Sequence, residues 1–136
     1  MGFDLEGQNA KNEEGEYFRN NIWWWRNLWR FVTIHCDKIL TDKEKDYGNW
    51  NEGKKIVKPK AEKIVKRLKE TISNGKALEF ETAVKKAQEK AKSNNKKLKG
   101  GVTDNEYDFR ENYPFTVENL KAFIKFVENS GGFRIF

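Results

Sequence analysis

The sequence predicts a single α+β domain over residues 1–136, mainly helical, with about four helices and a short two-stranded ribbon that pairs the N- and C-terminal segments. Three observations support this fold class. The chain of 136 residues has the length of one domain. Apolar residues recur at helical spacing in several stretches, and apolar and polar residues alternate at both ends of the chain.

The N-terminal stretch predicts a short strand followed by a loop. Phe3, Asp4 and Leu5 alternate between apolar and polar, and the pattern stops at Gly7. Residues 8–15 are polar and turn-like, so we expect a loop there.

An aromatic segment, Tyr17 to Phe31, predicts a nearly buried helix that Asn20 or Asn21 would cap. A strand is the alternative, since Trp and Ile favour strands, but about 15 residues without a turn signal favour the helix. We expect Trp25 and Trp29 in the core, and Trp23 or Trp24 exposed. The apolar residues fall in two adjacent helical rows: Ile22, Trp25, Trp29 and Val32, and Trp24, Leu28 and Phe31.

The middle of the chain predicts a long loop and two helices. Residues 37–53 are polar and predict the loop, with Tyr47 and Trp50 as its anchors. A helix should begin near Pro59 and end at Asn74-Gly75, and a flexible basic loop should span 93–103. The core row of the first helix is Ala61, Ile64, Val65, Leu68 and Ile72, and a weaker second helix is outlined by Leu78, Phe80, Ala83, Val84, Ala87 and Ala91.

The C-terminal part predicts an irregular stretch, a helix and a closing strand. Residues 104–114 are irregular but rich in aromatic residues. Thr116 should cap a helix that stops at 130–132, and residues 133–136 alternate as a strand. The core row of this helix is Leu120, Phe123, Ile124 and Val127.

The charge of the chain is concentrated in its middle. Over residues 54–99, 16 Lys or Arg stand against 5 Asp or Glu, a balance of +11, so the remainder carries −5 within a total of +6. This asymmetry suggests an anionic partner, either RNA or DNA or an acidic protein surface. The alternative is a solvated lysine face, because only Arg67 among the 16 is arginine. The candidate contact residues are Lys58, Lys63, Lys66, Arg67, Lys85, Lys86, Lys90, Lys96, Lys97 and Lys99.

The residues that catalysis usually needs are scarce, so we expect neither an enzyme nor a cofactor. His35 and Cys36 are the single histidine and the single cysteine, and side chains adjacent in sequence point about 100° apart on a helix. We therefore expect both at the end of a buried helix. The acidic residues Glu13, Glu14 and Glu16, with Asp4 and Glu6 nearby, could form a metal site, but a solvated acidic edge is the preferred interpretation.

The polar side of the aromatic helix is a second candidate contact surface. Trp23, Arg26 and Arg30 fall together on that side. Exposed Trp beside Arg can stack on bases or nucleotides. The same residue types dominate the hot spots of protein interfaces.

Nothing in the sequence indicates a membrane or an export signal. No apolar run approaches the roughly 18 residues of a membrane span. The start of the chain is acidic and lacks the basic-then-apolar order of a signal peptide. One cysteine allows no internal disulfide, which agrees with a reducing cytosol. We expect a cytoplasmic protein without a membrane partner.

Three stretches of the sequence, MGFDLEG, NEEGEYFRNNIWWWRNLW and FIKFVENSGGFRIF, carry a resemblance. The chain resembles a set of small uncharacterised bacteriophage and prophage proteins with an M-G-[FL]-D-x-x-G start, an N-E-x-G-x-Y-F-R-N-N-x-W-W-W-R box and a closing S-G-G-F. Residues 50–53 (WNEG) are similar to a degenerate form of a further motif. The resemblance covers roughly the first 35 and last 20 residues. Many members carry a Cys-rich insert before the final helix; this chain has the lysine-rich stretch instead, so no metal role carries over.

The resemblance implies a phage protein that acts in the cytoplasm of the bacterial host. By analogy, small phage proteins without enzymatic residues often counter host immunity. We therefore expect an inhibitor of a bacterial defence system, an anti-CRISPR protein that binds an effector nuclease and uses its lysine-rich middle to interfere with nucleic-acid contacts. The alternative is a nucleic-acid- or nucleotide-binding module, a signal sponge, with Trp23, Arg26, Arg30 and the lysines as its site. A metal-dependent nuclease that uses the acidic N-terminal cluster is a third interpretation.

Overall fold

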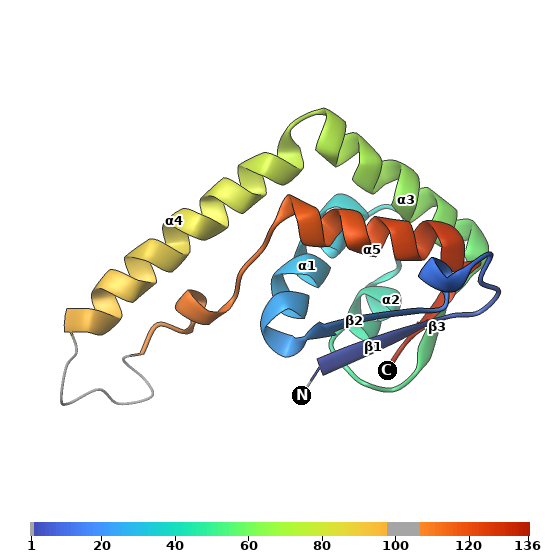
Figure 1. Ribbon diagram of the computed structural model, residues 1–136, viewed down its shortest axis with the longest axis horizontal. Coiled ribbons are helices and arrows are strands. Elements are labelled where there is room, and N and C mark those ends of the chain that lie inside the picture. The colour runs from blue at the N-terminus through green and yellow to red at the C-terminus, as the bar shows by residue number, and fades with distance from the viewer. Residues whose placement is uncertain (1, 98–106) are drawn as a thin grey trace.

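The computed structural model describes residues 2–97 and 107–136 as a four-stranded antiparallel sheet with helices packed on one face (Figure 1). Helices α1 and α5 lie against the sheet, and α3 lies along α5. The predicted mainly helical α+β fold is confirmed. The elements follow the order β1 (Gly2–Gly7), η1 (Glu13–Gly15), β2 (Tyr17–Asn21), α1 (Ile22–His35), α2 (Asp42–Tyr47), β3 (Lys54–Ile56), α3 (Lys58–Ser73), α4 (Lys76–Lys97), η2 (Phe109–Asn112), α5 (Val117–Ser130) and β4 (Phe133–Ile135).

The predicted terminal ribbon forms the centre of the sheet, whose strand order is β2-β1-β4-β3. β1 and β4 pair antiparallel, with Leu5 opposite Ile135. The prediction of only two strands was wrong, because β2 and β3 flank the ribbon. β2 lies at the start of the aromatic segment, up to the predicted helix cap, where no strand is predicted, and β3 has only three residues, two of them lysines. Neither strand carries an apolar alternation strong enough to be recognised alone.

Alternation along the strands gives the sheet one buried face and one solvent-facing side. The buried side chains come from all four strands and pack with the helices. On the outer side, Asp4 accepts hydrogen bonds from the Tyr17 hydroxyl and from Arg19 Nη1, the latter at 2.8 Å. These two bonds lower the pKa of Asp4. The buried side chains are Phe3, Leu5, Ile56, Phe133 and Ile135, with Phe18 packed against them.

Helix α1 begins at Ile22 because the Asn21 side chain accepts a hydrogen bond from the Trp24 backbone N–H at 3.1 Å, as predicted for this cap. Trp25 and Trp29 are buried, so their core assignment is confirmed. The Trp25 ring stacks between Phe3 and Trp29, with centroid distances of 5.3 and 5.4 Å. Trp24 is half-buried, whereas Trp23 is 41% exposed.

The predicted loop over 37–53 contains the short helix α2, so that prediction was wrong in part. Thr41 and Glu44 form a capping box at its start, which stabilises a helix that has no buried residue. A polar six-residue helix has no apolar periodicity to reveal it. Tyr47 packs against the core, as expected of an anchor, but Trp50 is 58% exposed and does not act as one.

Helices α3 and α4 follow one another around a tight turn at Gly75, whose φ is +84°. α3 begins at Lys58 with Pro59 in its first turn and ends at Ser73, as predicted. α4 extends to Lys97, so the loop predicted over 93–103 was wrong for residues 93–97, and the rest lies outside the described residues. The extra turn is held by Asn95, which donates to the Asp108 carbonyl at 3.0 Å and accepts from the Asp108 N–H at 2.8 Å.

The second half of α4 extends away from the body together with the segment that precedes α5 (Figure 1). We call residues 85–97 and 107–112 the arm. Gln88 also joins its two parts by donating to the Glu111 carbonyl at 3.3 Å. Apart from η2, residues 107–114 are irregular, as predicted for the described part of 104–114. No helix in the described residues combines the length and apolarity needed to cross a membrane.

The final helix α5 has the cap and the stop that the sequence predicts. The Thr116 side chain accepts from the Asn119 N–H at 3.0 Å, and Gly131 adopts a left-handed conformation with φ +66°. The loop after β1 then packs on this end of α5, with the Gln8 and Asn9 N–H groups donating to the Gly132 and Ser130 carbonyls at 2.8 and 2.9 Å. The first and last segments of the chain are therefore joined beyond the ribbon itself.

Candidate binding cleft on helix α1

The residues predicted to bind a partner fall into three separate groups. Trp23, Arg26 and Arg30 lie on α1. Lys99 lies outside the described residues. The remaining predicted residues divide between α3, with Lys58, Lys63, Lys66 and Arg67, and α4, with Lys85, Lys86, Lys90, Lys96 and Lys97.

Two members of the α1 group, Arg26 and Arg30, line a cleft of about 1150 Å³, and Trp23 is not part of its lining. Its floor is the polar side of α1, including Arg26 and Arg30. One wall consists of α2 and the turn that follows it, including Trp50. The opposite wall consists of Val84 and Ala87 of α4 with Arg110 and Tyr113. The cleft therefore lies between the arm and the α2 segment, and three distant parts of the sequence build it.

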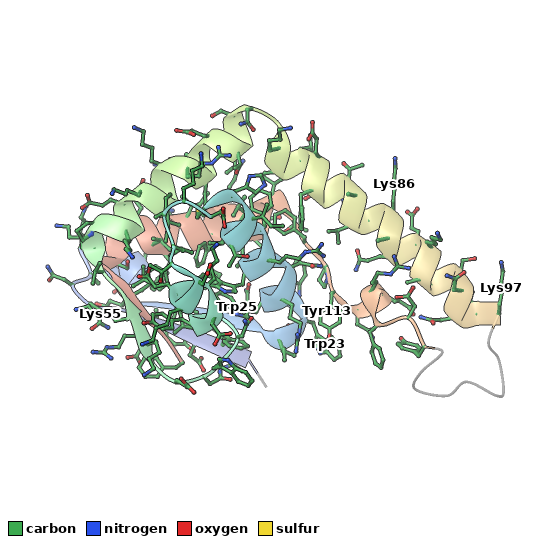
Figure 2. All side chains as sticks on the ribbon, turned by 180° about the vertical axis from the view of Figure 1, so that it is seen from behind. Trp23, Trp25, Lys55, Lys86, Lys97 and Tyr113 are labelled. Carbon is green, nitrogen blue, oxygen red and sulfur yellow. The ribbon has the colours of Figure 1, made fainter. Side chains whose placement is uncertain are left out.

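Tyr113 joins the arm-side wall to α1. The Asn27 side chain donates to the Tyr113 carbonyl at 2.7 Å, which fixes this segment against the helix. The Tyr113 ring lies beside Trp23, with 5.1 Å between centroids (Figure 2), and the Arg26 guanidinium carbon lies 5.8 Å from the same ring. A cation over an aromatic ring is attracted to its face. Tyr113 thus contacts two members of the predicted trio, Trp23 and Arg26.

The walls contain functional candidates that sequence reasoning missed. Trp50, Arg110 and Tyr113 all line the cleft, yet none was assigned to a site. The sequence predicts Trp50 as a loop anchor and residues 104–114 as an irregular stretch rich in aromatic residues. Exposure was the missing information, because Trp50 is identified as a surface aromatic only by its 58% exposure.

The charges lining the cleft favour an anion. Four cations line it and two carboxylates oppose them, a balance of +2. Lys45 pairs with Asp37 and lies 3.6 Å from Asp42, and Arg110 pairs with Asp108. Among the ion pairs of the described residues, none includes either arginine of α1. The cations are Arg26, Arg30, Lys45 and Arg110, and the carboxylates are Asp42 and Asp46.

The α4 lysines form two rows along the exposed side of the helix. Lys86, Lys90 and Lys97 share one side, because positions i, i+4 and i+11 are almost in line on a helix. Figure 2 shows Lys86 and Lys97 pointing away from the body. The second row is Lys85, Lys92 and Lys96, in which Lys85 lies 3.5 Å from Glu81. Over residues 85–97, six lysines stand against one glutamate.

The α3 group contributes less to a binding surface. Lys58, Lys63 and Lys66 are exposed, but none of them lines the cleft. Arg67 has a structural role, because its Nε donates to the His35 carbonyl at the end of α1 at 3.0 Å. Its Nη1 also pairs with Glu70 at 3.3 Å. The basic middle is therefore a set of separate surfaces rather than one patch.

His35 and Cys36 lie at the end of the buried helix α1, as predicted. Cys36 is fully buried at the C-cap of α1, and burial raises the pKa of its thiol to about 12. Partial burial lowers the pKa of His35, and Arg67 and Lys76 lower it further. The His35 ring lies against Phe31, with 4.2 Å between centroids.

The acidic N-terminal residues do not gather around a common point. Asp4 is engaged by Tyr17 and Arg19, and Glu14 pairs with Lys125 of α5 at 3.0 Å. Over residues 2–97 and 107–136, no three His, Cys, Asp or Glu side chains lie close enough together to hold a metal ion.

No protein-family model, curated protein or solved structure matches this chain.

Proposed function

We propose that this chain is a phage-type inhibitor of a bacterial defence system, an anti-CRISPR protein that binds an effector nuclease and interferes with its nucleic-acid contacts. The observation that carries the proposal is the exposed lysine row of α4. In this role the protein acts by binding, without a catalytic step and without a cofactor, in the cytoplasm of the bacterial host.

The position of the lysine row supports a contact with phosphates. The row of Lys86, Lys90 and Lys97 spans three turns of a helix that extends from the body, so it is open to a large partner. Three turns measure about 16 Å, which matches several phosphates of a nucleic-acid strand. Lysine acts as a point charge without base specificity, which suits a contact with a backbone rather than with a sequence.

The phage origin is supported by the resemblance of both ends of the chain to small phage and prophage proteins. The NEEGEYFRNN part of the box and the closing SGGF meet in the structure, where η1 and β2 lie next to the end of α5. These segments stabilise the fold, so α4 and the cleft are the surfaces available for a partner. The target itself is chosen by analogy with the habits of small phage proteins.

The test is inhibition of target cleavage by purified CRISPR effector complexes, with a Lys86→Ala/Lys90→Ala/Lys97→Ala variant beside the unaltered chain. The unaltered chain should lower cleavage by at least one effector at micromolar concentration. The triple variant should need about tenfold more protein for half-maximal inhibition. The slope of the logarithm of its apparent affinity against the logarithm of salt concentration should be smaller by about 2, as expected for three lost phosphate contacts.

The matched control is Lys38→Ala/Lys121→Ala/Lys125→Ala, which removes three exposed lysines that lie outside α4 and the cleft. Its inhibition should equal that of the unaltered chain. If no effector is bound or inhibited, the proposed target is wrong. If both triple variants weaken inhibition equally, overall charge is responsible and the α4 surface has no special role.

A second candidate function is a nucleic-acid- or nucleotide-binding module that sequesters its ligand. One observation favours it: two arginines without ion-pair partners in the described residues lie on the floor of a cleft with aromatic walls. If the protein binds nucleotides but inhibits no nuclease, this second function is supported and the first is wrong.

A further inference from the structure

We infer that the α1 cleft binds a nucleotide unit, with its phosphate on Arg26 and Arg30 and its base against Trp50. The inference rests on the second candidate function and not on inhibition of a nuclease. Its chemistry is shared by a free nucleotide and by a residue of a single strand, because both present a flat aromatic base and an anionic phosphate.

The phosphate position follows from the spacing of the two arginines. Arg26 and Arg30 are one helical turn apart on the same side of α1, so their Cβ atoms are about 6 Å apart. Both line the floor of the cleft, where neither has a carboxylate partner among the described residues. Guanidinium groups bind phosphate oxygens through paired N–H donors, so two such groups at this spacing can hold one phosphate between them.

The other cations of the cleft are less available for a ligand. Lys45 donates to Asp37, and Arg110 makes a two-pronged contact with Asp108, in which Nε lies 3.0 and 3.1 Å from the two carboxylate oxygens. Their charges still raise the local potential, because the cleft as a whole has an excess of two positive charges. The α1 arginines are therefore the part of the cleft suited to direct contact.

The base position follows from the aromatic walls. Trp50 presents 58% of its surface to solvent. Its ring is nevertheless held, because Nε1 donates to Asp46 Oδ2 at 3.1 Å. Tyr113 is half-buried, with its carbonyl bonded by Asn27 and its ring covered by Trp23 and the Arg26 guanidinium, so Trp50 is the exposed ring of the cleft. An exposed aromatic ring kept in place by neighbours offers a stacking surface at a small entropic cost.

The two carboxylates of the cleft do not oppose this pose directly. Asp46 uses Oδ1 to accept from the Asn49 side chain at 3.0 Å and Oδ2 to accept from Trp50, so its charge is partly compensated while it positions the ring. Asp42 lies at the start of α2 near Lys45. Both belong to the α2 wall, whereas the phosphate contacts are on the α1 floor.

The size of the cleft favours more than one nucleotide. Pockets for drug-sized ligands typically measure about 300–1,000 Å³. At about 1150 Å³ this cleft is larger, and its open side leaves room for a chain to enter and leave. A dinucleotide or a short stretch of single strand fills it better than a mononucleotide.

The experiment is calorimetric titration of the full chain with four probes: ATP, cyclic di-AMP, a deoxythymidine decamer and, as a polyanion without bases, a glutamate decamer. Each probe is tested on the unaltered chain, on Arg26→Ala/Arg30→Ala, and on the control Lys121→Ala/Lys125→Ala, which removes two exposed cations at the same i, i+4 spacing from α5. The arginine variant should weaken binding of the preferred probe at least about tenfold, and the control should change it less than about twofold. Trp50→Ala should weaken it about fivefold or more through lost stacking.

The outcomes distinguish a free nucleotide from a single strand as the ligand, and failure of the cleft inference from failure of the second candidate function. Tight binding of cyclic di-AMP or ATP alone indicates a free nucleotide, and preferential binding of the decamer indicates a single strand. If binding is instead lost in Lys86→Ala/Lys90→Ala/Lys97→Ala and retained in the arginine variant, the ligand binds on α4 and not in the cleft, and the protein is still a nucleic-acid-binding module. If no probe binds at 100 μM, both the cleft inference and the nucleic-acid-binding module are wrong. If the glutamate decamer binds equally well and also depends on the two arginines, the cleft recognises an anion and not a base.

Discussion

The backbones of Gly15 and Asn129 are so close that a Cβ on Gly15 would lie 1.9 Å from the Asn129 carbonyl oxygen. Gly15 in turn lies against Gly7, where an added Cβ would be 1.8 Å from the Gly15 carbonyl oxygen. These glycines belong to the MGFDLEG and NEEG stretches, and Asn129 belongs to the closing segment. These stretches of the sequence thus join the two ends of the chain.

We predict that Gly15→Ala destabilises the chain by about 3 kcal/mol, because backbone atoms of Asn129 would have to move. Gly75→Ala is the control. Gly75, unlike Gly15, has a positive φ of +84°, but nothing lies within 4 Å of the added Cβ, so the cost should be about 1 kcal/mol of backbone strain. Urea denaturation followed by circular dichroism measures both. Equal losses would show that the contact with Asn129 contributes nothing.

The long helices and the terminal ribbon could be predicted because their signals are periodic and local. The core rows of α3 and α5 repeat over several turns; α3 begins with Pro59 in its first turn, and α5 has a Thr116 cap and stops at Gly131. The alternation near Phe3 and Phe133 revealed β1 and β4. By contrast, β3 depends on pairing with β4, and α2 depends on a capping box and on the tryptophan N–H groups that bond to the carbonyls of Lys45 and Gly48.

The candidate site could be predicted only in part, because a cleft is a property of three dimensions. Helical spacing was enough to place Trp23, Arg26 and Arg30 on one side of α1. Nothing local in the sequence shows that Trp50 and Arg110, 60 positions apart, line the same cleft. The division of the lysines between α3 and α4 follows from the predicted break at Asn74-Gly75, but the sequence does not show that the α3 lysines lie away from the cleft.

We predict that Trp25→Ala and Trp23→Ala differ strongly in stability although the residues are two positions apart. Trp25 is 1% exposed, stacks on Phe3 and Trp29, and donates Nε1 to the Gly48 carbonyl at 2.7 Å. Its truncation should cost about 3–5 kcal/mol. Trp23 is 41% exposed, and its truncation should cost about 1 kcal/mol through lost contact with Tyr113. Similar midpoints of urea unfolding for the two variants would contradict this assignment.

We predict that stability falls as the pH drops from 7 to 5.5 and that His35 causes most of this change. The folded-state pKa of His35 is lowered, chiefly by burial, so below its ordinary value of 6.5 the unfolded chain binds the proton more readily. Above pH 6.5 both states are neutral and the effect vanishes. One proton limits the slope to about 1.4 kcal/mol per pH unit.

The measurement is the free energy of unfolding at four pH values for the unaltered chain and for His35→Phe, which keeps a ring against Phe31. Because His35 is the one histidine of the chain, the variant should lose most of the slope in this window. An unchanged slope would assign the effect to carboxylates, whose ordinary pKa values lie lower.

We predict that Cys36 does not react with thiol reagents in the folded chain at pH 8. The thiol is 0% exposed, and burial raises its pKa to about 12, so both access and the reactive thiolate are lacking. Labelling with dithiobis-nitrobenzoate should be at least about a hundredfold slower than in the urea-unfolded chain. Since reaction then requires local opening of the end of α1, the rate should rise in Arg67→Ala, which removes the hydrogen bond to the His35 carbonyl. Fast labelling of the unaltered chain in the absence of urea would contradict the burial of Cys36 beneath that end of the helix.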